Sequence, residues 1–363
     1  MRFYTFILLV FLCGCSLTVP KEVEVKYEEI PEKVDFNYHV KPILSDRCYS
    51  CHGPDEKSRR AGLRLDQEKT AFMKLSSGRT AIDPGSISGS EMAHRILSDD
   101  PDEVMPTPES NLSLTNTEKA ILLKWIEQGA EWKEHWSFLP IQEVSSSSSN
   151  QYKNPIDYFI SKKLKTNGLE FSPISSKEKL IRRLYFDLTG LPPSIDEVES
   201  FVNTNDKNAY LKVVNRLLDS DEHAERLTMD WLDVSRYADS HGLHADGIRT
   251  MWPWRDWVIK AFKNNTPYDE FVSVQLSGDM RENATKEEKL ATAFNRNNPM
   301  TAEGGVIDEE WRLNYVFDRT ETLGTAVMGL TLMCAKCHDH KFDPISQKDY
   351  YQLSAFFNQT REI

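Results

Sequence analysis

The sequence contains two copies of one pattern, Cys-x-x-Cys-His, at Cys48-Tyr49-Ser50-Cys51-His52 and Cys334-Ala335-Lys336-Cys337-His338. The chain has six cysteines, and apart from Cys13 and Cys15 near the N-terminus all of them belong to these two motifs. In such a motif two thiols add to the vinyl groups of a porphyrin, and the histidine that follows binds the iron. The sequence therefore predicts two covalently attached c-type haems.

Two other uses of Cys-x-x-Cys pairs explain less of the pattern. A disulfide suits an exported protein but does not need a histidine directly after the second cysteine. A zinc ribbon usually separates its two pairs by about 15–20 residues, whereas nearly the whole chain separates these two. A zinc-binding module without redox function remains as an alternative.

The N-terminus has the features of an export signal. Arg2 precedes an apolar run, Phe6–Leu12, that is too short to span a membrane. The following Cys13-Gly14-Cys15 completes a segment that resembles a bacterial lipoprotein signal over residues 1–15, so that Cys15 would be lipidated. We expect export to the periplasm or cell envelope, a membrane anchor through Cys15, and a polar tether over residues 16–33. An ordinary signal peptide is the alternative.

Composition limits the class of partner. With 363 residues, 39% of them hydrophobic and 28% charged, the chain is long and apolar enough for two or three globular domains. Its formal net charge of -12 argues against nucleic acid, because a phosphate-binding surface needs a basic excess.

Residues 34–140 have the order of elements of a class I cytochrome c. An apolar helical stripe precedes Cys48, and a Thr115/Glu118 capping box starts a closing helix that ends at Gly129. The residues of the stripe are Phe36, Val40, Ile43 and Leu44. Between the two helices Met105-Pro106 supplies a thioether in a restrained loop, 53 residues after His52. We predict Met105 as the distal iron ligand; the competitors are Met73, Met92 and His94.

These residues resemble the planctomycete cytochrome c domain family. The segments that carry the resemblance are Phe36-x-x-x-Val40-x-Pro42-Ile43-Leu44, Cys48-x-x-Cys51-His52-Gly53-Pro54, Ala61-Gly62-Leu63-Arg64-Leu65-Asp66, Asp102-Glu103-Val104-Met105-Pro106 and Trp125-Ile126-x-x-Gly129-Ala130-x-Trp132. In that family a second proline usually follows Met-Pro, whereas this chain has Thr107.

A serine run, Ser145–Ser149, marks a linker over residues 141–152, and residues 153–363 are predicted to form a mostly helical second domain that ends in the second haem motif. Asn154-Pro155 starts one helix, and Ser175/Glu178 and Ser194/Glu197 predict capping boxes for two more. The domain resembles the domain of unknown function that follows the planctomycete cytochrome domain in large exported proteins. The main matching segments are Arg182–Pro193, Trp231–Asp239, Trp254–Phe262, Pro267–Phe271, Gln275–Asp279, Cys337–Pro344 and Tyr350–Leu353.

The second motif lacks an obvious distal ligand. His338 would bind the iron from one side, and two residues of chain are too few for His340 to reach the other side. His340, Lys341 and Asp343 are predicted to surround the haem without binding the iron, and His241 and His244 are the candidate distal ligands. An open sixth position is the alternative, and it would let small molecules bind.

The sequence supports two functions of different kinds besides the zinc module. The first is electron transfer by an exported, lipid-anchored dihaem c-type cytochrome. Its partner would be a redox protein or an additional C-terminal domain. The resemblance implies that such chains usually continue into a further domain of this kind. The second is a haem-dependent oxidoreductase whose open second haem acts on an unidentified substrate, with carbohydrate as one candidate.

Overall fold

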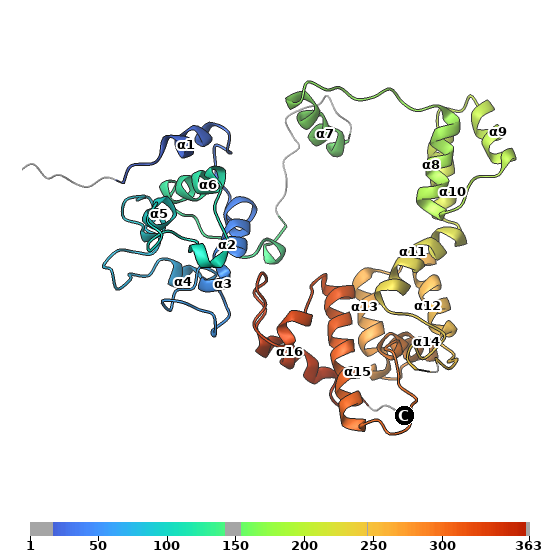
Figure 1. The fold of residues 1–363 in the computed structure, drawn as a ribbon. Coiled ribbons are helices and arrows are strands. Elements are labelled where there is room, and N and C mark those ends of the chain that lie inside the picture. Colours follow the sequence, from blue (N-terminus) through green and yellow to red (C-terminus); the bar gives the residue numbers. More distant parts are fainter. Residues whose placement is uncertain (1–16, 142–153, 245, 361–363) are drawn as a thin grey trace, which may run out of the picture. The chain divides into compact units, whose positions relative to one another are not determined.

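The chain folds into helices joined by loops (Figure 1). A computed structural model describes residues 17–141, 154–244 and 246–360, and this part of the chain is mainly helical and contains no β-strand. The predicted mainly α class is therefore confirmed. The predicted lipidation of Cys15 and the serine linker lie outside the described residues.

Two compact units make up the structure. The first comprises Met1–Ile141 and Cys334–Gln347, and the second comprises Gln142–Met333 and Lys348–Ile363. Both Cys-x-x-Cys-His motifs fall in the first unit, although the second motif follows the helical domain in the sequence.

The first unit is built from short helices around one hydrophobic core. In chain order its α-helices are α1 (Lys21–Glu24), α2 (Lys41–Arg47), α3 (Tyr49–His52), α4 (Glu68–Ala71), α5 (Glu91–Leu97) and α6 (Asn116–Glu127). A π-helical turn, Phe36–Val40, leads directly into α2. The predicted capping box of α6 is present: Thr115 Oγ1 accepts from the Glu118 backbone N–H, and Glu118 accepts from the Thr115 N–H. Beyond α6 the chain turns at Gly129, whose φ is +98°.

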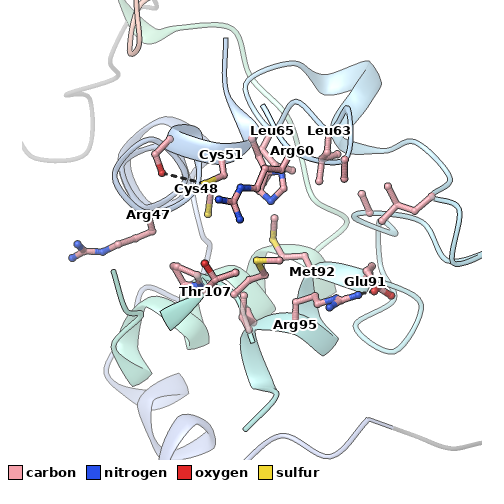
Figure 2. Close-up of a pocket in the computed structure, with 18 of the residues that line it drawn as sticks. Arg47, Cys48, Cys51, Arg60, Leu63, Leu65, Glu91, Met92, Arg95 and Thr107 are labelled. Carbon is pink, nitrogen blue, oxygen red and sulfur yellow. Dashed lines mark hydrogen bonds and ion pairs between the residues drawn. The ribbon is translucent and has the colours of Figure 1, made fainter. Parts of the chain in front are cut away.

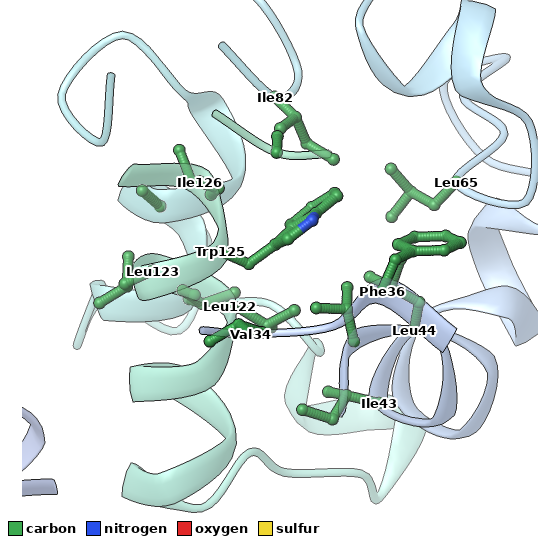
Figure 3. Close-up of a cluster of buried hydrophobic side chains, with 14 of the residues drawn as sticks. Val34, Phe36, Ile43, Leu44, Leu65, Ile82, Leu122, Leu123, Trp125 and Ile126 are labelled. Carbon is green, nitrogen blue, oxygen red and sulfur yellow. The ribbon is translucent and has the colours of Figure 1, made fainter. Parts of the chain in front are cut away.

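The core of this unit joins the segment before the first motif to α6 (Figure 3). The predicted stripe is buried, with Phe36 2% and Leu44 0% exposed, and Trp125 of α6 is 1% exposed. The ring centroids of Phe36 and Trp125 are 5.7 Å apart. Two segments that are far apart in the sequence therefore pack together, because each presents an apolar face at helical spacing.

Residues 17–30 differ from the tether predicted over 16–33. They contain α1 and a 3₁₀ turn at Val25–Glu28, and α1 packs against α6. Val23 is 1% exposed, and Lys124 of α6 donates to the Tyr27 carbonyl oxygen. The scattered apolar residues among the Glu and Lys residues are enough to bind this segment to the core.

The second unit has two separate hydrophobic clusters. One lies among α8 (Lys177–Thr189), α9 (Ile195–Asn203) and α10 (Ala209–Leu218). The other is formed mainly by α11 (Asp221–Val234), α12 (Trp252–Lys263), α13 (Tyr268–Ser277) and α14 (Lys286–Ala291). The remaining α-helices of the unit are α7 (Pro155–Thr166), α15 (Asp308–Thr322) and α16 (Gln347–Ser354), whose first residue belongs to the first unit.

The predicted helix starts in the second unit are mostly confirmed. Asn154 caps α7, and Ser194 and Glu197 form the capping box of α9. The box predicted at Ser175 and Glu178 is wrong, because the N-cap residue of α8 is Ser176 and its side chain makes no capping hydrogen bond. Ser175 instead accepts a hydrogen bond from Arg183.

An ion pair links the turn after α11 to α15. Arg236 has a left-handed backbone conformation, φ +59°, and its guanidinium pairs with Asp318. Burial, with the nearby charges of Arg319 and Arg249, lowers the pKa of Arg236 to about 10. A guanidinium in this setting depends on its carboxylate, because the other charges nearest to it include two arginines.

Replacing this carboxylate should therefore destabilise the second unit. We expect Asp318→Asn to lower the free energy of unfolding by about 2 kcal/mol, somewhat less than the loss for a fully buried pair, as measured by urea unfolding. The matched control is Asp256→Asn, which breaks an Arg255–Asp256 pair whose side chains are 40% and 48% exposed and should cost less than about 1 kcal/mol. Equal losses in the two variants would contradict the assignment.

Candidate haem site

The first motif is a single helical turn that places its three functional side chains on one face. Cys48 precedes α3, and its carbonyl oxygen accepts from the Cys51 N–H at 3.1 Å and the His52 N–H at 2.8 Å. Residues at positions i, i+3 and i+4 of an α-helix are neighbours on its surface. The two thiols and the imidazole therefore converge on one side of α3.

The loop after the motif closes over the end of this helix. Arg60 N–H donates to the Cys51 carbonyl oxygen at 2.8 Å, and Leu65 N–H donates to that of His52, also at 2.8 Å. The chain can start this loop only through Gly53, because a Cβ there would lie 2.3 Å from the Tyr49 carbonyl oxygen.

A cavity of about 520 Å³ lies against α3. Its volume is within the range of about 300–1,000 Å³ that is usual for cofactor pockets. Figure 2 shows Cys48 and Cys51 on one side of the cavity and Met92 and Arg95 of α5 on the other. Apolar side chains form much of the wall, which suits a porphyrin plane. The apolar lining residues include Leu63, Leu65, Ala81, Ile96 and Leu114.

The polar groups of the motif suit a covalently held haem. His52 Nδ1 is buried and has no hydrogen-bond partner in the described structure, and burial lowers the pKa of this imidazole. A neutral imidazole is the form that binds iron. Burial, together with the neighbouring Cys51 thiol, raises the pKa of Cys48 to about 12. A neutral thioether would be accommodated at Cys48 more readily than a thiolate.

The predicted distal ligand lies at the same cavity. Met105, Met92 and Met73 line it, but His94 does not, because its Nε2 contacts the Ser88 carbonyl oxygen at 2.9 Å. Met92 packs against the hydrophobic core, and Met73 is 36% exposed. Met105 is half-buried in a loop whose backbone bonds to α5. All three methionines thus line the cavity, and Met105 as the distal ligand stays a prediction.

Five charged residues line the cavity and were not predicted from the sequence, and two of them form an ion pair on α5. Glu91 and Arg95 lie four residues apart on α5, and their side chains are ion-paired at 2.9 Å. Glu91 is only 7% exposed. Their i, i+4 spacing was the available signal, but it is common on solvent-exposed helices and so did not identify them.

The second motif has a different local geometry. Met333–Lys336 form a 3₁₀ turn, and Cys334, Cys337 and His338 are all exposed. Cys337 and His338 follow this turn, and the Cys337 N–H donates to the Cys334 carbonyl oxygen at 3.3 Å. The His338 Nδ1 contacts the Asp339 carbonyl oxygen at 2.7 Å.

The residues predicted to surround the second haem form a compact turn. His340 is buried, and its Nδ1 accepts from the backbone N–H groups of Phe342 and Asp343. Asp343 also lies 3.5 Å from the same ring nitrogen. Lys341 is exposed and lies over the Phe342 ring. His340 thus shapes the turn after the motif.

The two candidate distal histidines of the second haem lie in the second unit. His244 Nδ1 is 3.0 Å from Glu303 Oε1. His241 Nδ1 is buried and has no partner among the described residues. Neither position tests the predicted ligation.

The described residues contain no preformed site for the zinc ion of the alternative interpretation. Over residues 17–141, 154–244 and 246–360, no group of three or more His, Cys, Asp or Glu side chains is arranged to hold a metal ion.

In the same ranges every helix is too short or too polar to cross a membrane.

A Cys-x-x-Cys-His helix that faces a largely apolar cavity, with methionines at the same cavity, defines a c-type cytochrome domain. Residues 48–110 match the family PSCyt1, Planctomycete cytochrome C, which implies covalent haem c at Cys48 and Cys51. Residues 155–362, more than half of the chain, match PSCyt2, a protein of unknown function (DUF1549). The chain therefore belongs to the PSCyt2 family and carries a planctomycete cytochrome C domain before the family's own domain. No curated protein or solved structure matches it.

The close approach at Gly53 gives a test of this site. We expect Gly53→Ala to displace the backbone of α3, to cost about 1–3 kcal/mol through overpacking, and to lower the haem bound per protein chain, as measured by the reduced pyridine-haem spectrum. In the control Gly62→Ala the new Cβ meets no atom within 4 Å. Only the left-handed conformation then costs about 1 kcal/mol, and haem attachment should be retained. Full haem content in Gly53→Ala would contradict the role given to this glycine.

Proposed function

We propose that the protein is an exported, lipid-anchored c-type cytochrome with two haems that transfers electrons to or from a redox partner or a further catalytic domain. The observation that carries the proposal is the cavity at the first motif. It combines the attachment residues, a neutral imidazole and a loop methionine in one mostly apolar space. Haem c, when bound, supplies the one-electron redox chemistry.

The residues of the first site would each have a distinct role. Cys48 and Cys51 would hold the cofactor by thioether bonds, and His52 and Met105 would bind the iron. A ligand pair of His and Met raises the reduction potential. The apolar wall excludes water, which also disfavours the more highly charged oxidised form. These features are those of a closed electron-transfer site.

Two observations support the proposed second haem: its attachment motif and the place of that motif in the first unit. Cys334, Cys337 and His338 complete a second attachment sequence, and both motifs lie in one compact unit. Attachment there would require residues 334–338 to form one α-helical turn, as in the first motif, so that His338 and the two thiols share one face. Such a change is local, because the three side chains are exposed.

The exposure of the second motif favours one further candidate function. An iron bound by His338 alone would keep an open sixth position, where small molecules can bind. The protein would then be a haem-dependent oxidoreductase in which the first haem passes electrons on. Its substrate is unidentified, and carbohydrate is one candidate.

Ligand replacement tests the first site. We expect Met105→Ala to remove the weak thioether-to-iron absorption band of the oxidised protein and to lower the midpoint potential, because the iron loses its soft sulfur ligand. The matched control is Met92→Ala, which removes the core-packed sulfur of the same cavity and should keep the band. If the band survives in Met105→Ala and disappears in Met92→Ala, the distal ligand is Met92.

Haem counting tests the second site. The reduced pyridine-haem spectrum should give two haems per wild-type chain and one in the double variant Cys334→Ala/Cys337→Ala, because each pair of thiols holds one haem. Carbon monoxide binding to one of the two reduced haems would favour the oxidoreductase, and binding to neither would favour simple transfer. A spectrum without a c-type band would overturn both functions.

A further inference from the structure

The loop that carries Met105 is fastened to α5 by two hydrogen bonds, and both involve Arg95. The Arg95 carbonyl oxygen accepts from the Met105 N–H at 3.1 Å. The Arg95 Nη1 donates to the carbonyl oxygen of Glu103 at 3.3 Å. Arg95 thus binds the loop at Met105, the predicted iron ligand, and at Glu103, two residues before it.

The Arg95 side chain is itself held by a buried carboxylate. Its Nε donates to Glu91 Oε1 at 2.9 Å, and Arg79 Nη1 donates to the other oxygen, Glu91 Oε2, at 3.1 Å. Burial alone would raise the pKa of Glu91, but the hydrogen bonds from the two arginines lower it overall. Glu91 is therefore ionised at neutral pH and directs the Arg95 guanidinium along α5, where Figure 2 shows the two side chains next to each other.

We propose that Arg95 is the positioning residue for the distal iron ligand, with Glu91 as its support. The inference rests on the proposed haem at the first motif and on Met105 as its ligand. A bond between thioether and iron is weak, so its occupancy depends on how often the loop brings the sulfur to the iron. The guanidinium fork joins α5 to the Glu103 carbonyl oxygen, and the Arg95 carbonyl oxygen fixes the Met105 backbone. Together they restrict the loop to the ligating position.

The planar guanidinium is essential to this role. It reaches a carboxylate through Nε and a carbonyl oxygen through Nη1 at the same time, which the single ammonium group of lysine cannot do from a fixed geometry. The Arg95 side chain is 35% exposed, so the strength of its contacts is that of a partly solvated, charge-assisted hydrogen bond and not that of a buried ion pair.

The experiment compares variants of the full chain in the Cys334→Ala/Cys337→Ala background, in which only the first motif can hold haem. Carbon monoxide can bind the reduced iron only when Met105 leaves it, so the binding rate reports loop opening. We expect Arg95→Gln to raise that rate about tenfold, which corresponds to about 1.4 kcal/mol in the opening equilibrium. The thioether band of the oxidised protein should weaken in the same variant.

Two further variants separate positioning from folding. Arg95→Lys keeps the charge beside Glu91 but loses the fork, so it should also raise the rate while leaving the urea midpoint near that of the background protein. Arg79→Gln removes the other partner of Glu91, touches neither Glu103 nor Met105, and should leave the rate and the band unchanged.

The outcomes distinguish this inference from the proposed function. A thioether band and a carbon monoxide rate that are unchanged in both Arg95 variants would overturn the role of Arg95 and leave the haem site standing. Equal acceleration in Arg79→Gln would also overturn it, because the effect would then belong to Glu91 alone. A background protein without any thioether band would overturn both the distal methionine and this inference.

Discussion

The contact between Phe36 and Trp125 is the constraint on which the haem site depends. It joins the segment that leads into the first motif to the closing helix α6, and so fixes the wall from which Cys48, Cys51 and His52 face the cavity. The two thioether bonds attach the porphyrin, but they do not by themselves fix the protein side chains that bind the iron. Because both helices present large apolar faces, the folding of the domain itself aligns the attachment turn, and the cofactor enters a site whose main wall is already in place.

What the sequence could predict here was local in origin. The Thr115 and Ser194 capping boxes and the stripe ending at Leu44 each depend on residues within a few positions, and periodicity reports such relations directly. The sequence could not decide between Ser175 and Ser176 as the α8 N-cap, because either serine could begin that helix. The pairing of Arg95 with the loop at Glu103 depends on how the chain returns to α5, and no spacing rule encodes it.

The two motifs have the same sequence pattern but different surroundings. Around Cys48 the flanking segments are apolar and pack, so the motif is helical and half-buried. Around Cys334 the chain also buries Leu332 and Ala335, but the motif begins in a 3₁₀ turn and its two thiols and His338 are exposed. Identical chemistry in the motif therefore does not imply identical sites. The fold of the neighbouring residues decides how closely each haem would be enclosed, and with it the accessibility of the iron.

The exposure of Cys334 and Cys337 also bears on how the protein matures. Two accessible thiols separated by two residues can close to a disulfide in an oxidising compartment, and that reaction competes with porphyrin attachment. The thiols of the first pair are half-buried, whereas those of the second pair are exposed. In an exported protein with the two haems proposed above, loading of the second motif would therefore depend on a thiol reductant in the same compartment. Under oxidising growth conditions such a chain would accumulate with the first haem in place and the second pair closed.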